Sequence, residues 1–230
     1  MKHIQKNITP EARQALRTFI RLEKEKAHYD NFKGSDGKSD VQKSLLIEQG
    51  FLCAYCMRRI VMPSKIEHWV TREKSNRDKK PKQTVDYKNI LAVCNGTTFQ
   101  DDIKHEHCDQ SRSKSNRELT INPTDERTIL QLRLLKNGWI ESDNQDINDD
   151  LNNENALNLN TEFLRFDRKD VYNSVKYLID LKCRNKTPAQ AKKIISDIVE
   201  DWTKKTVNDE GHLQHKEYCA IVPYFFKKHT

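Results

Sequence analysis

Apolar residues recur at helical spacing toward both ends of the chain, and these stretches predict most of its regular structure. Thr9, which a proline follows, is typical of a helix start, because threonine caps the first turn and proline fits it. Apolar positions three and four residues apart then predict an amphipathic helix that ends before Gly34, and a second helix over 40–49. The same spacing predicts helices over 161–183 and 188–202.

The residues between these helices follow less regular patterns. Asn137-Gly138 is a strong turn signal in an apolar-rich stretch, so residues 128–140 are expected to form a short hairpin. Residues 143–160 are rich in asparagine and aspartate and are expected to be a loop, a linker or a helix-capping region. Aromatic residues gather over 218–226, where we expect them to close a core rather than dock a partner. The pattern therefore predicts an α+β fold that is mostly helical.

Four cysteines in the middle of the chain have the spacing of a metal site. Cys53 and Cys56 form a Cys-x-x-Cys pair, which places two thiolates on one turn, and Cys94 and Cys108 can complete a zinc tetrahedron. Disulfides are the alternative, but the first residues have no apolar segment of the kind that directs secretion. A thioredoxin-like redox pair would need a βαβ context, which the pattern does not predict.

The fourth ligand of this predicted zinc site stays open. His105 and His107 both lie close to Cys108 and carry nitrogen atoms that zinc also accepts. The thirteen residues between Cys94 and Cys108 are more than a compact zinc knuckle uses. The sequence therefore leaves a choice among the cysteine and the two histidines.

Glu67 and His68 lie between the cysteine pair and the later single cysteines. Ile66 and Trp69 flank them, which predicts a short strand that ends near the histidine. A lone histidine is more often a hydrogen-bonded core residue, but this one follows a carboxylate, and Asn89 comes later in the chain. Adjacent strand residues face apart, so both can serve one site only if the strand ends in a loop or bulge there.

These residues together resemble a known family. Their order is similar to that of HNH endonucleases with a ββα-metal fold, in the subclass that carries a four-cysteine zinc site. More narrowly, they resemble the HNH nucleases of Septu-type and retron-associated phage defence, over about residues 45–125. The strings that carry the resemblance are Phe51 to Cys56, Ile66-Glu67-His68, Asn89 to Cys94, Val93 to Gly96 and His107-Cys108-Asp109.

The resemblance implies a small ββα-metal core with a zinc knuckle, embedded between N-terminal and C-terminal helices. It implies that His68 is the general base and that Glu67 and Asp109 bind a catalytic Mg²⁺ or Mn²⁺ ion. It also places Asn89 in the catalytic motif, where its amide is expected to tie the loop between strand and helix. Asn95 is the runner-up for that position, and the zinc on the four cysteines is expected to be structural.

The resemblance also implies the partners and the biological setting. The chain would be the DNA-cleaving effector of an anti-phage complex, with an ABC-type ATPase that holds it inactive until triggered. In the retron-associated versions of this complex, a reverse transcriptase and its DNA–RNA product would be further components. The alternative is a zinc-dependent nucleic-acid-binding or scaffold subunit without cleavage, which has no need of a carboxylate–histidine pair. The expected division is residues 1–50, an N-terminal helical segment; 51–120, the nuclease core; and 121–230, a mostly helical region.

Composition adds a modest preference for a polyanionic partner. The 230 residues carry a net charge of +7, and 33% of them are charged. Basic runs over 71–82 and 112–117 would flank the proposed site, where they either contact phosphates or form solvated surface. No apolar run approaches the length that crosses a bilayer, so no membrane partner is expected. The six cysteines, without a secretory segment, fit a reducing compartment, so the chain is expected to be cytoplasmic.

One further hypothesis concerns a second ion near the C-terminus. His212, His215 and Cys219 are spaced so that they would share one face of a helix. Helical histidines at this spacing are common without metal, so we prefer the interpretation that these three residues bind no ion. Cys183 and Cys219 are then expected to be inert thiols.

Overall fold

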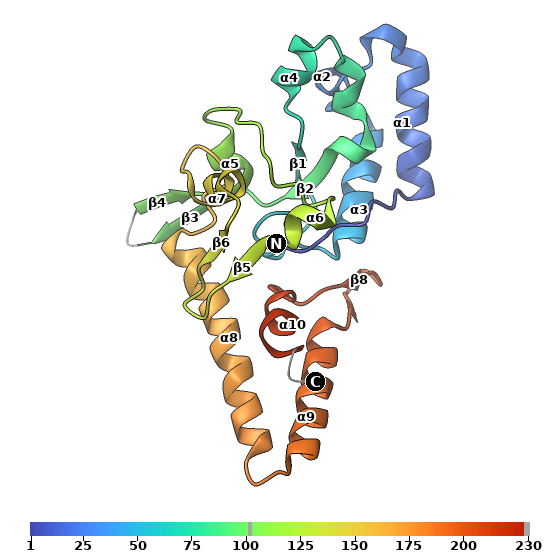
Figure 1. Cartoon of the computed structure of the whole chain (residues 1–230). Coiled ribbons are helices and arrows are strands. Elements are labelled where there is room, and N and C mark those ends of the chain that lie inside the picture. The colour runs from blue at the N-terminus through green and yellow to red at the C-terminus, as the bar shows by residue number, and fades with distance from the viewer. Residues whose placement is uncertain (101–102, 228–230) are drawn as a thin grey trace.

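A computed structural model describes residues 1–100 and 103–227 of the chain (Figure 1). The described chain is mostly helical, and its strands pair into small two-stranded antiparallel sheets. The mostly helical α+β fold predicted from the sequence is confirmed. No helix in the described ranges is long and apolar enough to span a bilayer.

Three helices near the N-terminus form a support for the middle of the chain. The Thr9 hydroxyl accepts a hydrogen bond from the Ala12 backbone N–H, as expected for an N-cap. The first helix ends earlier than predicted, because Lys24 takes a left-handed φ of 51°. Gly50, with φ 61°, ends the third helix. The elements are α1 (Pro10–Glu23), the 3₁₀ turn η1 (Lys24–Lys26), α2 (Tyr29–Phe32) and α3 (Gly37–Gln49).

The middle of the chain is built on one antiparallel strand pair and a short helix. Strand β1 pairs with β2 in a register that sets Lys65 opposite Val93 and His68 opposite Ile90. A long connection between these strands folds into a helix and two 3₁₀ turns. The elements are β1 (Lys65–His68), α4 (Arg72–Arg77), η2 (Pro81–Val85), η3 (Tyr87–Asn89), β2 (Ile90–Val93), β3 (Thr97–Gln100), β4 (Ile103–Glu106) and α5 (Cys108–Arg112).

A hairpin and a helix follow. The predicted hairpin forms, with Gly138 at φ 84° in its turn. Of the three alternatives expected for residues 143–160, the helix-capping region agrees with the structure, because the Asn144 side chain caps a helix there, and Ile147 and Leu151 of that helix are buried on one face. The elements are α6 (Glu126–Ile129), β5 (Leu132–Leu134), β6 (Ile140–Ser142) and α7 (Gln145–Asn152).

Two long helices form a hairpin that extends away from the rest of the molecule (Figure 1). A capping box between Thr187 and Gln190 begins the second of them. The aromatic tail packs against the first, because Tyr172 contacts the rings of Phe225 and Phe226, so the prediction that the tail closes a core is confirmed. The elements are α8 (Glu162–Cys183), α9 (Pro188–Thr203), β7 (Thr206–Val207), β8 (Leu213–Gln214) and α10 (Ile221–Phe226).

The largest hydrophobic cluster surrounds the cysteine-bearing segments. It includes Leu16 of α1, Leu45 of α3, Leu91 of β2 and Leu151 of α7, together with the side chain of Cys53. The cluster draws residues from all three segments that the sequence analysis distinguishes, and that division stays a prediction. The cysteines therefore lie inside the main core rather than on a separate appendage.

Candidate metal centre and the adjoining polar pocket

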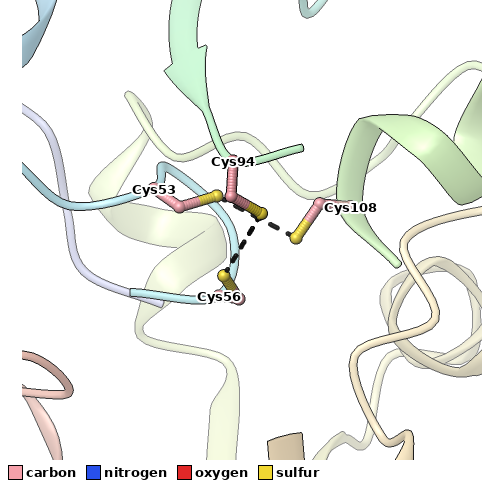
Figure 2. A group of neighbouring side chains, drawn as sticks. All are labelled: Cys53, Cys56, Cys94 and Cys108. Carbon is pink, nitrogen blue, oxygen red and sulfur yellow. Dashed lines mark hydrogen bonds between the residues drawn. The ribbon is translucent and has the colours of Figure 1, made fainter. Parts of the chain in front are cut away.

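Four cysteine thiols from three separate segments meet at one point. Cys53 and Cys56 come from the turn after α3, Cys94 follows β2, and Cys108 begins α5. Figure 2 shows the four sulfur atoms turned toward one another. All four lie within 4.8 Å of each other. The sequence grouped these same cysteines, and the structure confirms that they form a cluster able to bind a metal ion such as zinc.

The spacing of the sulfur atoms fits a tetrahedral ion. A Zn–S distance of about 2.3 Å places the corners of a tetrahedron about 3.8 Å apart. The Cys56 and Cys94 sulfurs are 3.8 Å apart, and those of Cys53 and Cys108 are 3.9 Å apart. The donor set is soft, and three of its four cysteines are buried while Cys94 is partly buried, which is typical of a structural zinc site.

Backbone hydrogen bonds fix the turn that carries the first pair. The Met57 N–H donates to the Cys53 carbonyl over 3.1 Å, and the Cys53 N–H donates to the Arg58 carbonyl over 2.8 Å. The Ala54 N–H reaches the Ala92 carbonyl of β2 over 3.1 Å. These bonds hold the turn against the strand that leads to Cys94, so two of the three contributing segments are joined independently of any ion.

A glycine lets the other two segments meet. Gly96 follows Cys94, takes φ 70°, and accepts a hydrogen bond from the His107 N–H over 2.8 Å. A Cβ at Gly96 would lie 2.4 Å from the His107 carbonyl oxygen and 2.7 Å from Gln110 Cβ. Only glycine fits this backbone conformation and this close approach. Because Gly96 has no side chain, the segments that carry Cys94 and Cys108 can approach closely enough for the two thiols to meet.

The structure brings Cys108, not a histidine, into the fourth position. His107 lies beside the cluster, with Nδ1 3.2 Å from the Cys108 sulfur and 4.0 Å from that of Cys94. His105 lies on β4 and is not part of the group. Burial raises the pKa of the Cys108 and Cys56 thiols, whereas hydrogen bonds from neighbouring thiols, that of Cys108 first, lower the pKa of Cys94. A divalent cation would offset the mutual repulsion of four thiolates.

A polar pocket of about 400 Å³ lies at the end of β1, next to this cluster. Glu67, His68 and Asp109 all line it. Glu67 and His68 are the last residues of β1, and Asp109 is on the first turn of α5, directly after Cys108. Both side chains of the adjacent pair reach one pocket because the strand stops at His68. The structure thus brings three of the four predicted catalytic residues together.

The imidazole of His68 is held in one orientation. Its Nε2 lies 2.9 Å from the Thr84 carbonyl oxygen, and the edge-on ring of Tyr29 is 4.6 Å from the imidazole centroid. Because a carbonyl oxygen only accepts, Nε2 carries the proton and Nδ1 is left as the acceptor. Burial lowers the pKa of His68 to about 4, against the opposing effect of the Thr84 hydrogen bond. The ring is therefore neutral near pH 7.

Glu67 is a buried carboxylate that a buried arginine holds in place. Arg112 donates to its Oε1 atom, and the Tyr55 hydroxyl lies 3.3 Å from the same atom. Burial raises the pKa of Glu67, and the neighbouring Asp109 carboxyl raises it further, whereas the Arg112 guanidinium opposes both effects. Two carboxylates so close together favour a shared cation, and hard oxygen ligands suit Mg²⁺ or Mn²⁺. Glu67 and Asp109 therefore fit the implied catalytic ion.

Arg112 is the residue of this site whose role the sequence analysis missed. It was grouped with a basic run expected either to contact phosphates or to form solvated surface, yet it is 2% exposed. Beyond Glu67, its guanidinium donates to the carbonyls of His68 over 3.0 Å, Trp69 over 2.8 Å and Arg117 over 2.8 Å. The sequence contained one weak sign that Arg112 is buried. Arg112 stands four residues after Cys108, on the same face of α5 as that buried cysteine.

The two asparagines proposed for the third motif position differ in the structure. Asn89 does not line the pocket; its side chain accepts from the Val70 N–H over 2.8 Å and donates to the carbonyls of Val70 and Gln83 over 3.0 and 3.1 Å. It thus joins the segment after β1 to η2, which carries Thr84. Asn95 is exposed and lies away from the pocket. Its catalytic role stays a prediction, as does that of Asn89.

The first basic run forms α4 and the start of η2, and acidic side chains pair with most of its cations. Arg77 and Lys74 contact Glu118, and Lys82 contacts Glu25. Arg72 pairs with Asp30 and is the cation of the run that lines the pocket.

The hypothesis of a second ion near the C-terminus was wrong. His212 and His215 flank strand β8 rather than sharing a helix face with Cys219. The His215 ring packs against Gly50, where an added Cβ would lie 2.5 Å from it. Within the described residues, the four cysteines are the group of three or more histidine, cysteine or carboxylate side chains that lie close enough together to share one ion.

Comparison with known proteins adds no relative. No protein-family model matches the chain, and no curated protein matches it.

Proposed function

We propose that the chain is a metal-dependent HNH endonuclease that hydrolyses DNA phosphodiester bonds. The observation that carries the proposal is the convergence of Glu67, His68 and Asp109 on one pocket beside a four-thiol cluster. The antiparallel pairing of β1 with β2, together with the helix α5 that carries Asp109, supports a ββα-metal core of the kind the sequence resembles. A module that only binds nucleic acid has no need of an oriented histidine between two carboxylates.

The chain's own groups have separate tasks in this proposal. His68 Nδ1 accepts the proton of the attacking water, because Thr84 occupies Nε2 and fixes the ring. Arg112 holds Glu67 and the carbonyls of the two residues that follow it, which keeps the end of β1 in position. Glu67 and Asp109 would hold the Mg²⁺ or Mn²⁺ ion. When bound, such an ion stabilises the charge that develops on the phosphate and on the leaving oxygen.

The four cysteines have a structural task in the same proposal. A zinc ion on Cys53, Cys56, Cys94 and Cys108 would fix the start of α5 relative to the end of β2. Asp109 follows Cys108 directly, so the position of the second carboxylate depends on the thiolate site. A closed thiolate site and an open carboxylate site would thus lie side by side.

The proposed setting follows from the sequence resemblance alone. We propose a cytoplasmic effector of an anti-phage complex, held inactive by an ABC-type ATPase. A retron reverse transcriptase with its DNA–RNA product is a further proposed partner. Copurification of the tagged chain with such an ATPase from its own host would support this setting, and recovery of the chain alone would count against it.

The nuclease proposal is tested by cleavage of supercoiled plasmid with Mg²⁺ or Mn²⁺. We expect the wild-type chain to cut and His68→Ala to lose at least about a hundredfold in rate, as for loss of a general base. Both proteins should contain the same amount of zinc, because His68 is not in the thiol cluster. Equal cutting by both would remove His68 as the base. Binding without cutting by either would favour the non-cleaving nucleic-acid-binding module.

A further inference from the structure

The polar pocket has a wall that does not belong to the β1, β2 and α5 core. Tyr29 and Asp30 of α2 line it, and so does Arg72 at the start of α4. Tyr29 and Asp30 come from the N-terminal helical segment. That segment therefore contributes directly to the site.

Helix α2 is anchored so that Tyr29 stays at the pocket. Phe32 at the end of α2 is 1% exposed and packs edge-on against Phe19 of α1, with ring centroids 5.0 Å apart. At the start of α2, the Tyr29 N–H donates to the Thr84 hydroxyl over 2.9 Å. Thr84 also presents its carbonyl oxygen to His68. One residue thus positions both the histidine and the tyrosine that touches it.

Tyr29 connects the histidine to an arginine. Its ring meets His68 edge-on, and the Arg72 guanidinium carbon lies 5.5 Å from the Tyr29 ring centroid. The guanidinium also donates from Nη1 to Asp30 over 2.8 Å. A single hydrogen bond to Asp30 leaves further N–H donors of the fork for another acceptor. The Arg72 side chain is 49% exposed, so an acceptor from solution can reach it.

The charges around the pocket single out Arg72. Among the described residues that line it, the carboxylates are Asp30, Glu67, Glu73 and Asp109, and the cations are Arg72 and Arg112. Arg112 is buried, and its N–H groups already donate to Glu67 and to three backbone carbonyls. Arg72 is then the cation on this wall that can meet a polyanion. A guanidinium also matches phosphate geometry, because its donors form a planar fork.

We propose that Arg72 binds a backbone phosphate of the nucleic-acid substrate at the mouth of this pocket, and that Tyr29 and Asp30 hold it there. This inference rests on the proposed nuclease function and names the residue that grips the substrate. It narrows the basic run to one residue, because Arg72 is the cation of the run that lines the pocket, whereas Lys79 and Lys80 do not line it. The other cations of the run, which are Lys74, Arg77 and Lys82, pair with acids outside the pocket. Tyr29 is a positioning residue, because its ring contacts His68 edge-on and lies under the guanidinium of Arg72.

The test measures DNA affinity as a function of salt, in the His68→Ala background so that the DNA stays intact. A fluorescently labelled duplex is titrated with protein at several NaCl concentrations, and the slope of log affinity against log salt is recorded. Each lost phosphate contact lowers the magnitude of this slope by about 0.9. Arg72→Ala should lower it by about that amount and weaken binding about tenfold at moderate salt.

Arg77→Ala is the matched control, because Arg77 is on the same helix, is exposed, and also pairs with an acid. It should leave the slope unchanged. Tyr29→Phe should bind like the parent, whereas Tyr29→Ala should weaken binding by a fraction of the Arg72→Ala effect. Melting curves should show that all variants fold, since Arg72 and Arg77 lie on the surface.

Failure of this inference and failure of the nuclease proposal are distinguishable. If the wild type cuts plasmid but Arg72→Ala and Arg77→Ala share the parent's slope, the role of Arg72 is overturned and the nuclease proposal stands. If the wild type does not cut but Arg72→Ala alone lowers the slope, Arg72 binds phosphate in a non-cleaving module. If the parent binds no DNA at any salt concentration, both are overturned.

Discussion

The guanidinium of Arg112 on α5 and the carboxylate of Glu67 on β1 form an ion pair whose side chains are 3% and 8% exposed. The pair joins the helix that starts at the thiol cluster to the strand that ends at the pocket. A buried ion pair of this kind is costly to break, because the remaining charge has no water to solvate it. The pair therefore ties the metal centre to the proposed catalytic pocket.

Removing Arg112 should destabilise the fold strongly. In Arg112→Met, Glu67 is buried without its cation, and three backbone carbonyls lose a donor, so we expect a loss of about 3–5 kcal/mol in the free energy of unfolding. Urea denaturation gives the value. Arg127→Met is the control, because Arg127 pairs with Asp125 on the surface and its side chain is 88% exposed. That variant should change stability by less than about 0.5 kcal/mol.

The double variant Glu67→Leu/Arg112→Met separates charge from packing. It leaves no unpaired buried charge, so it should recover part of the stability that Arg112→Met loses. It should be inactive in cleavage, because Glu67 is proposed to hold the catalytic ion. If Arg112→Met unfolds at the same urea concentration as Arg127→Met, the ion pair does not have the role described here.

Zinc content should depend on the clustered cysteines and on no other cysteine of the chain. We expect about one zinc per purified wild-type chain, because the four thiols provide one closed tetrahedral site. Cys56→Ser should lose most of the metal and fold poorly, whereas Cys183→Ser should keep both. Cys183 lies outside the cluster, with its sulfur 3.9 Å from the Ala191 carbonyl. Elemental analysis of the purified variants measures their zinc content. A metal-free but fully stable Cys56→Ser protein would refute the structural role of the zinc ion.

Gly96 should tolerate no side chain, and Gly211 provides the comparison. Both take a left-handed backbone, with φ of 70° and 79°, but a Cβ at Gly211 would meet nothing within 4 Å. Gly211→Ala should therefore cost only the backbone strain, about 1–2 kcal/mol. Gly96→Ala should cost about 1–3 kcal/mol more, because its Cβ would collide with the backbone of His107. Equal losses in urea unfolding would show that this close approach is not needed.

The two asparagines should differ sharply on substitution. Asn89→Ala removes three hydrogen bonds that join Val70 and Gln83, so we expect a loss of about 1–3 kcal/mol and slower plasmid cleavage. Asn95→Ala, at an exposed position, should behave like the wild type in both measurements. A larger effect at Asn95 would move the third motif position there.

The sequence predicted those features that depend on local pattern or on the chemistry of a residue type. Cysteine spacing identified the thiol cluster, and helical periodicity identified α8 and α9 nearly to their ends. It did not predict that Arg112 is buried, because a charged residue is normally exposed and its partner is 45 residues away in the chain. Tyr29 was missed for a similar reason, since only the packing of α2 on η2 brings it to His68.

The missed helix α7 shows a different cause. Composition indicated a loop, a linker or a helix-capping region, but not a helix of its own, because asparagine and aspartate are frequent in residues 143–160. The signals for a helix were present, with Asn144 as the cap and Ile147 and Leu151 four residues apart. Two buried apolar side chains and a cap outweighed low helix propensity.

The most direct test of the account is anomalous diffraction from crystals of the wild-type chain grown with zinc and soaked in Mn²⁺. We expect a zinc signal among Cys53, Cys56, Cys94 and Cys108, and a separate manganese signal in the pocket that Glu67, His68 and Asp109 line. Manganese found only at the thiols, or nowhere near the two carboxylates, would contradict the proposal of a catalytic ion beside His68.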